Sequence, residues 1–252
     1  MLAQAGVALL VLSGGASRAD EAVSPVRASA SVTATAALGL VVQPAPLAAR
    51  YEVSVTAPGG KPAAARRFQW TFIRDAERVA LQKGPIDETW FRDPQGRLSF
   101  ERVFHDEQRV ADYSTGELAT LGVQADWTAL SSFIDPRELA SLKIVSRSGR
   151  GVNERIRLAG TAGGQALSVE WVPALQLPAK VLRQGRDGSV TRFELAQHAA
   201  TAPATWPVPG ARSAGYLHLD AADFGDMDYE PVVRQSEALD VRSGWRTAHG
   251  HD

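Results

Sequence analysis

Cysteine is absent from the 252-residue sequence. Its absence excludes disulfide bonds, thiolate zinc sites, iron–sulfur clusters, cysteine nucleophiles and attachment of a lipid to a cysteine. A chain of this length can bury a hydrophobic core without such cross-links, because the need for them falls mainly on small domains. We therefore expect one compact domain that is held together by packing and hydrogen bonds.

An excess of charge of one sign is also lacking, since 27 basic residues are balanced by 28 acidic ones and the net charge is −1. Such a chain has no general attraction for nucleic acid or for an anionic membrane. With 44% hydrophobic and 22% charged residues, the composition is that of an ordinary globular protein. We expect no nucleic-acid partner.

The sequence has no apolar run of the length that spans a membrane, which takes about 20 residues. The run Gly6–Leu12 is short, and small residues at Ser17 and Ala19 precede Asp20 in the pattern that signal peptidase accepts. We predict that residues 1–19 are a signal peptide cleaved after Ala19, that the protein is periplasmic, and that its mature form has no membrane span. No lysine or arginine precedes the apolar run, so a disordered N-terminus on a cytoplasmic protein is the alternative.

A second uncharged stretch covers residues 28–49. It is rich in alanine, serine and threonine and is interrupted by Pro44 and Pro46, which makes it too polar for a spanning helix. We predict that residues 20–50 form a linker or an edge segment.

Alternation of apolar and polar residues begins at Tyr51 and is typical of β-strands. Two of the alternating runs carry large apolar side chains, most of them aromatic, on one face: Phe68, Trp70 and Phe72 in the first, and Leu98, Phe100 and Phe104 in the second. The segment Asp93-Pro94-Gln95-Gly96 precedes the second run and fits a type I turn, since proline presets the backbone dihedral that its second position requires. These patterns predict antiparallel hairpins.

Helix signals interrupt the strands in the middle of the chain. Ser114 and Glu117 have the spacing of a capping box. Residues 126–134 carry apolar side chains on one side of a short helix, and Asp135-Pro136 suits the cap and first position of another. We therefore predict two or three short helices between residues 114 and 142.

Strands resume between Leu142 and Leu195, where Asp187-Gly188 is a favoured hairpin turn. Proline-rich and acidic residues make up the extension 199–252, which we expect to pack on the domain. Strands, a helical insert and more strands predict an α+β fold dominated by antiparallel sheet, with its domain at residues 51–198.

This order of elements resembles the LolA/LolB-like superfamily of periplasmic lipoprotein carriers. The segments that carry the resemblance are Val169–Pro173, Leu177–Lys180, Asp187-Gly188 and Phe193–Leu195, in which an aromatic-bearing strand runs through a Leu-Pro step into a hairpin. The resemblance implies an antiparallel sheet that is curved into a half-barrel and covered by short helices from the central insert. Because the chain has no cysteine, the lipidated receptor type of that superfamily is excluded and a carrier-like relative is left. The resemblance also implies an arginine that senses an acyl chain, although the pattern singles out no arginine for that role.

Under this resemblance the protein is a non-enzymatic carrier or sensor of an amphiphilic or lipid-like ligand. An apolar sheet face under movable helices would shelter an acyl chain and gain about 0.8 kcal/mol per buried CH₂. The same side chains would also form an ordinary core without any ligand, which is the competing interpretation. The residues expected to line the cavity are Phe68, Trp70, Phe72, Phe100 and Phe104 from the sheet and Trp127 and Phe133 from the helices.

Other functions leave different signals. His249 and His251, next to a C-terminal aspartate, could hold a divalent metal ion, so periplasmic metal handling is one alternative. An accessory subunit that binds another envelope protein is a second. Acidic residues gather at 218–230, but their spacing misses the calcium-binding EF-hand, and we expect a surface segment there. The sequence shows neither a GxSxG nor a phosphate-binding loop, so we expect no cofactor and no enzymatic activity.

Overall fold

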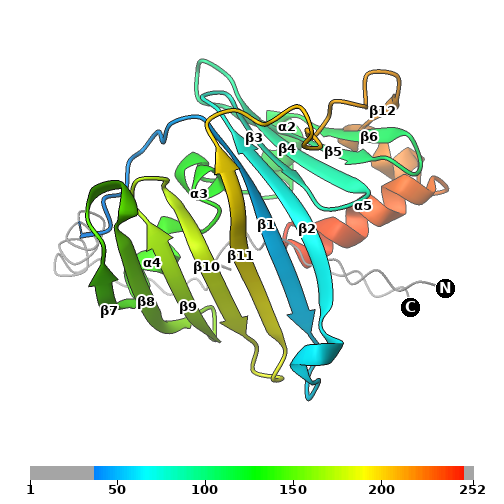
Figure 1. The fold of residues 1–252 in the computed structure, drawn as a ribbon. Coiled ribbons are helices and arrows are strands. Elements are labelled where there is room, and N and C mark those ends of the chain that lie inside the picture. Colours follow the sequence, from blue (N-terminus) through cyan, green and yellow to red (C-terminus); the bar gives the residue numbers. More distant parts are fainter. Residues whose placement is uncertain (1–36, 247–252) are drawn as a thin grey trace, which may run out of the picture.

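The computed structural model describes residues 37–246. The predicted signal peptide at 1–19, much of the predicted linker, and His249 and His251 lie outside the described residues. Within them the chain forms one open sheet of twelve strands, antiparallel except at one edge, with a few short helices (Figure 1). The predicted α+β half-barrel is confirmed.

The spatial order of the strands is β12-β6-β5-β4-β3-β2-β1-β11-β10-β9-β8-β7. Two meanders, β1 to β6 and β7 to β11, are joined where β1 pairs with β11, and β12 pairs parallel with β6. The strands are β1 (Leu47–Thr56), β2 (Arg66–Arg74), β3 (Arg78–Gln82), β4 (Ile86–Arg92), β5 (Leu98–Phe104), β6 (Arg109–Tyr113), β7 (Lys143–Ser148), β8 (Arg155–Ala162), β9 (Gln165–Val172), β10 (Leu177–Gln184), β11 (Val190–Ala199) and β12 (Leu217–Asp220).

Strand β1 begins at Leu47, earlier than the alternating pattern indicates, and it lies in the middle of the sheet. Ala48 and Ala49 are fully buried in it. The small side chains of these alanines fit closely packed surroundings but are only weakly hydrophobic. The alternation of apolar and polar residues is therefore not evident before Tyr51. The residues just after Pro46 are therefore part of a central strand.

Three short helices connect the meanders: α2 (Thr115–Thr120), α3 (Trp127–Ser131) and α4 (Pro136–Ser141). All three begin where the sequence predicts. Ser114 and Glu117 form the capping box, and the side chains of Asp126 and Asp135 accept hydrogen bonds from backbone N–H groups of the helices that follow them. Because these caps satisfy backbone donors locally, they can be read from a few neighbouring residues.

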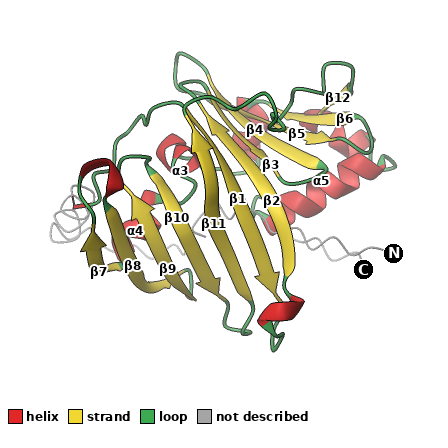
Figure 2. Ribbon diagram, in the orientation of Figure 1, coloured by secondary structure: helices red, strands yellow, loops and turns green. Residues whose placement is uncertain are grey.

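The helices lie on one face of the sheet, called here the inner face (Figure 2). The last helix, α5 (Pro231–Arg242), adds Val232 and Val233 to the same hydrophobic core. Short 3₁₀ helices occupy Pro62–Ala64, Gly151–Asn153 and Ala221–Asp226. No helix among residues 37–246 is both long enough and apolar enough to cross a membrane.

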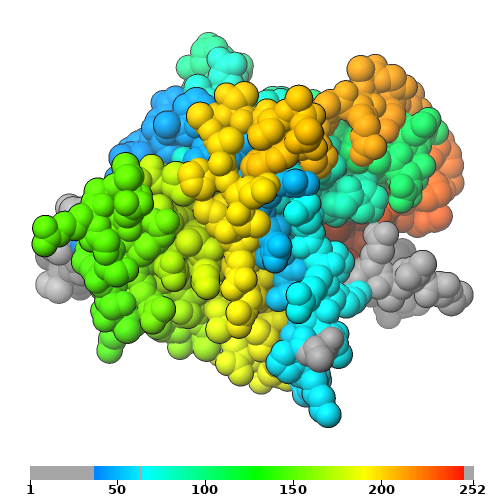
Figure 3. All heavy atoms as spheres, in the orientation of Figure 1, coloured from blue at the N-terminus to red at the C-terminus, as the bar shows by residue number. Residues whose placement is uncertain are grey.

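The opposite, outer face is covered only in part. Trp206, from the proline-rich segment after β11, packs on Ala48 and Ile73, and the Arg50 guanidinium lies 5.3 Å from the centre of its ring. In the space-filling view this segment crosses the upper part of the outer face, while much of the sheet below it faces the viewer (Figure 3). The outer face is thus covered over the start of β1 and the end of β2, where Ala48 and Ile73 lie, and is open over β8 to β11 and over the rest of β1 and β2.

A candidate ligand-binding face under two short helices

Helices α3 and α4 and the residues between them (127–141) are called here the lid. The inner face of β1, β2 and β11 receives an aromatic side chain from the connection between the two helices. Phe133 stacks on Tyr51 with ring centres 4.3 Å apart and makes edge contacts with Trp70, Phe72 and Phe193 at 5.5–6.5 Å. Offset and edge-to-face contacts of this kind are the arrangements that aromatic rings prefer. Phe133 is therefore the main apolar link between lid and sheet.

The backbone of Phe133 has φ = 62°, in the left-handed region that bulky residues rarely occupy. Such a conformation costs roughly 1–2 kcal/mol and persists only where surrounding contacts compensate for it. Here the compensation is the insertion of the ring among four aromatic neighbours. The lid is held in place by a side chain whose own backbone would relax if the ring withdrew.

Arg74, at the end of β2, makes the polar link between lid and sheet. Its guanidinium donates to the carbonyl oxygens of Ser131 at 2.7 Å, Leu175 at 2.6 Å, Gln176 at 3.1 Å and Ala45 at 3.0 Å. Burial lowers the pKa of Arg74 to about 10, partly offset by the nearby Tyr51 hydroxyl. This buried cation is stabilised by main-chain dipoles from three separate segments.

The other predicted residues occupy neighbouring parts of the inner face. Phe100 packs in a second aromatic cluster, with Trp245 at 5.1 Å and Trp90 at 4.8 Å between ring centres. Phe104 is fully buried, and Trp127 is buried beneath the Arg92 guanidinium, 4.8 Å from its ring. Phe68 is different, because 39% of it is exposed at the rim of this face.

A buried ion pair joins the second cluster to helix α5. Arg102 is almost fully buried, and its Nη1 donates to Asp240 Oδ1 at 2.9 Å, while its Nε lies 3.4 Å from Glu88 Oε1. The Tyr113 hydroxyl donates to the second carboxylate oxygen of Asp240 at 3.0 Å. Lys83 completes the set by pairing with Glu88. The sheet and the last helix are therefore connected through charges that are removed from water.

Glu88 links this network to acid stability. Burial acts to raise its pKa, but Lys83 and Arg102 outweigh that effect and hold the pKa below its usual value. Because the folded-state pKa is the lower one, Glu88 contributes stability above its unfolded-state pKa of about 4.3 and loses it as the pH falls through the folded-state value.

We therefore expect Glu88→Gln to be less stable than the unmodified protein at pH 7, and the difference to shrink as the pH falls below about 4. Urea denaturation at several pH values measures it, with Glu154→Gln on the surface as a control. A difference that stays constant down to pH 3 would contradict the assignment.

Comparison with known proteins finds likeness only in structure. No protein-family model matches the chain, and none of the curated proteins does. A MucA/MucB complex from Pseudomonas aeruginosa matches 70% of this chain and 59% of its own at 17% identity and a TM-score of 0.36. PNGF-II matches 74% of this chain at 12% identity and a TM-score of 0.38, and this chain spans 34% of its length.

A LolA superfamily protein from Nitrosomonas europaea is also among the similar structures, with 9% identity, 69% of this chain and 94% of that chain covered, and a TM-score of 0.24. That protein belongs to the superfamily that the order of elements resembles. The likeness concerns the fold and identifies no ligand.

The structure brings together some of the predicted lining residues. Trp70, Phe72 and Phe133 meet beneath the lid, whereas Phe100 lies in the cluster under α5. The sequence prediction missed Arg74 and Arg102 as inward-facing residues, although a signal for both exists. Each stands two positions after an inward-facing aromatic residue, and period-two alternation places it on the same face.

For metal binding, no cluster of three or more suitable side chains occurs among residues 37–246. His218 is paired with Asp112 at 2.6 Å, and part of the acidic segment forms strand β12 at the sheet edge. The proposed metal ligands His249 and His251 lie outside the described residues, so that alternative stays a prediction.

Proposed function

We propose that this protein is exported to the periplasm and acts there as a non-enzymatic carrier or sensor of an amphiphilic ligand, which binds on the inner face beneath the lid. The observation that carries the proposal is the set of hydrogen bonds from Arg74. One buried side chain of the sheet holds the lid, the segment before β1 and the β9–β10 turn through carbonyl oxygens alone.

The hydrogen bonds from Arg74 to main-chain carbonyl oxygens, called here the latch, can break and form again. In the described part of the chain Arg74 has no carboxylate partner, so releasing Arg74 from the carbonyl oxygens separates no ion pair, and the freed carbonyl groups can turn to water. Helices α3 and α4 contain five and six residues, too few to be stable by themselves. Their position therefore depends on Arg74, on Phe133 and on the ion pair between Glu138 and Arg183 at 2.6 Å.

The free energy that a ligand gains on burial can be compared with the free energy of the lid contacts that it would replace. Hydrogen bonds to a charged group contribute about 1.5–3 kcal/mol each, and burial of an aromatic side chain contributes about 1.5–3 kcal/mol. An acyl chain that buries about ten CH₂ groups gains roughly 8 kcal/mol. A chain of that length would offset part of the cost of opening the lid, which also exposes the buried side chains of Leu130, Ile134 and Leu139. In its absence the closed state prevails.

The test uses the protein recovered from the periplasm without detergent. Native mass spectrometry measures any co-purifying mass, and N-phenyl-1-naphthylamine fluorescence with displacement by palmitate measures occupancy of an apolar site. Since the ligand binds the open state, weakening the latch raises the apparent affinity in proportion to the open population. We expect Arg74→Lys, which keeps the charge but cannot bond all four carbonyl oxygens, to tighten probe binding about ten-fold, as a change of 1.4 kcal/mol gives.

The matched control is Arg157→Lys on the outer face, which should leave probe binding unchanged. Circular dichroism and urea denaturation confirm that each variant is folded. The proposal is contradicted if neither palmitate nor the probe binds to any folded variant, or if Arg74→Lys and the control behave alike. Finding the protein only in the cytoplasmic fraction would contradict export separately.

A further inference from the structure

The open part of the outer face carries a ladder of polar side chains across neighbouring strands, and all of them but one are charged. Its members are cross-strand partners in the order Arg157, Glu170, Lys180, Glu194, Glu52 and Gln69, on β8, β9, β10, β11, β1 and β2. From Arg157 to Glu194 the sign alternates, and opposite charges that face each other across strands are stabilising. Most of the ladder therefore neutralises itself.

The alternation breaks where β11 meets β1, because Glu52 stands directly opposite Glu194. Like charges in this position are destabilising. Glu194 has cationic neighbours, with Arg192 at 3.4 Å and Lys180 at 3.7 Å. Glu52 is exposed and has neither an ion pair nor a side-chain hydrogen bond with any residue of 37–246, so its charge is unmatched.

An unmatched cation lies beside it. Arg67, on β2, is two positions before Gln69, the cross-strand partner of Glu52. Diagonal neighbours of this kind have Cα atoms about 7–8 Å apart, within reach of long side chains. Arg67 nevertheless makes no ion pair with any carboxylate in the described part of the chain, and Ser54 separates it from Arg192 on the row beside the ladder.

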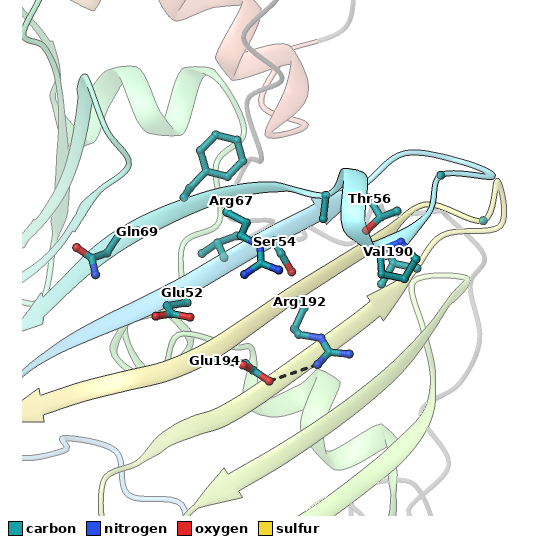
Figure 4. Close-up of a pocket in the computed structure, with 14 residues that line it drawn as sticks. Glu52, Ser54, Thr56, Arg67, Gln69, Val190, Arg192 and Glu194 are labelled. Atoms are coloured by element: carbon teal, nitrogen blue, oxygen red, sulfur yellow. Dashed lines mark hydrogen bonds and ion pairs between the residues drawn. The ribbon is translucent and has the colours of Figure 1, made fainter.

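These groups lie at a hollow in the surface. Glu52, Ser54, Arg67 and Arg192 are among the residues that line a depression of about 660 Å³, closed at one end by the loop around Pro62 and the turn at Gly188. Their side chains are drawn around this depression in Figure 4. A second hollow of about 260 Å³ shares Arg192 and Glu194 with it.

We propose that this hollow binds a small zwitterion, with a primary ammonium group between Glu52 and Glu194 and an oxyanion, phosphate or carboxylate, at Arg67 and Arg192. An ammonium group donates three hydrogen bonds and relieves the repulsion between the two carboxylates. Two guanidinium groups with a serine hydroxyl between them suit an oxyanion. Phe68 also lines the hollow, but the charged groups of the site lie on the outer face and none of them contacts the lid, so the proposal does not depend on the carrier function.

The ligand can be free in solution or be the headgroup of phosphatidylethanolamine, and the test separates the two. Titration with O-phosphoethanolamine, followed by amide NMR shifts, measures binding of the soluble zwitterion; phosphate alone and ethanolamine alone are the half-ligand controls. Sedimentation with vesicles of phosphatidylcholine, with and without phosphatidylethanolamine, measures binding to the headgroup.

Binding in either arm is expected to weaken about ten-fold or more in Glu52→Gln and in Arg67→Gln, each of which removes one charge-assisted contact. It should also weaken with added salt, since the site is exposed. Arg147→Gln and Glu154→Gln are matched controls, because they make the same substitutions in an exposed ion pair outside the hollow.

Loss of binding in the two site variants but not in the controls supports the site, and the arm in which it occurs identifies the source of the ligand. The site is overturned if neither arm shows binding, if phosphate alone binds as well as the zwitterion, or if the four variants behave alike.

Discussion

Replacing Asp240 with asparagine is expected to lower the free energy of unfolding by about 3 kcal/mol. The substitution conserves volume but leaves the buried Arg102 guanidinium without its closest carboxylate. Removing one partner of a buried pair typically costs about 3–5 kcal/mol, because the remaining charge stays out of water. We expect the lower end of that range because Glu88 remains 3.4 Å from Arg102.

The double variant Arg102→Met/Asp240→Leu tests whether the loss of stability in Asp240→Asn comes from the unpaired charge. It removes both members of the pair and fills the space with apolar atoms, an exchange that is often neutral or stabilising. We therefore expect it to be more stable than Asp240→Asn, as measured by urea denaturation monitored through tryptophan fluorescence. Glu154→Gln, in an exposed ion pair, should cost at most about 1 kcal/mol. If the double variant loses as much stability as the single variants Arg102→Met and Asp240→Leu added together, the connection between α5 and the sheet depends on packing and not on charge.

The residues of this network show which contacts could be predicted from the sequence and which could not. Arg102 follows Phe100 by two positions, so its inward orientation could be predicted from alternation alone. Its partner could not, since Asp240 is 138 residues away and only the folding of α5 onto the sheet brings the two together. Glu88 and Lys83 are close in sequence, but nothing local indicates that they are buried.

The same distinction applies to the lid. The helix starts at Asp126 and Asp135, like the start of α2 at Ser114, were predicted, because a cap satisfies backbone donors within three residues of itself. The contacts of Arg74 were not, since its acceptors are carbonyl oxygens, which every residue possesses and which leave no trace in a sequence. The pattern grouped Phe68 with Trp70 and Phe72, but it could not show that the helices leave Phe68 partly exposed.

Phe133 gives the second large expected effect. Phe133→Ala removes a ring from contact with Tyr51, Trp70, Phe72 and Phe193, and large-to-small changes of a buried phenylalanine cost about 3–5 kcal/mol. Phe133→Gly loses the same ring but relieves the left-handed backbone, which glycine adopts freely. Although glycine ordinarily destabilises more than alanine, at this position we expect it to be the more stable variant by about 1 kcal/mol.

Urea denaturation of the two variants measures that order, and probe fluorescence reports on the lid in the same samples. Ala129→Gly in helix α3, where the backbone is helical, is the matched control in which glycine should be worse by about 0.5–1 kcal/mol. If Phe133 holds the lid through packing that compensates for its strained backbone, both ring-deleted variants bind N-phenyl-1-naphthylamine more tightly than the unmodified protein. Glycine that is less stable than alanine at position 133 would contradict the strained backbone. Unchanged probe binding in both variants would show that this ring belongs to the core and does not control access to the inner face.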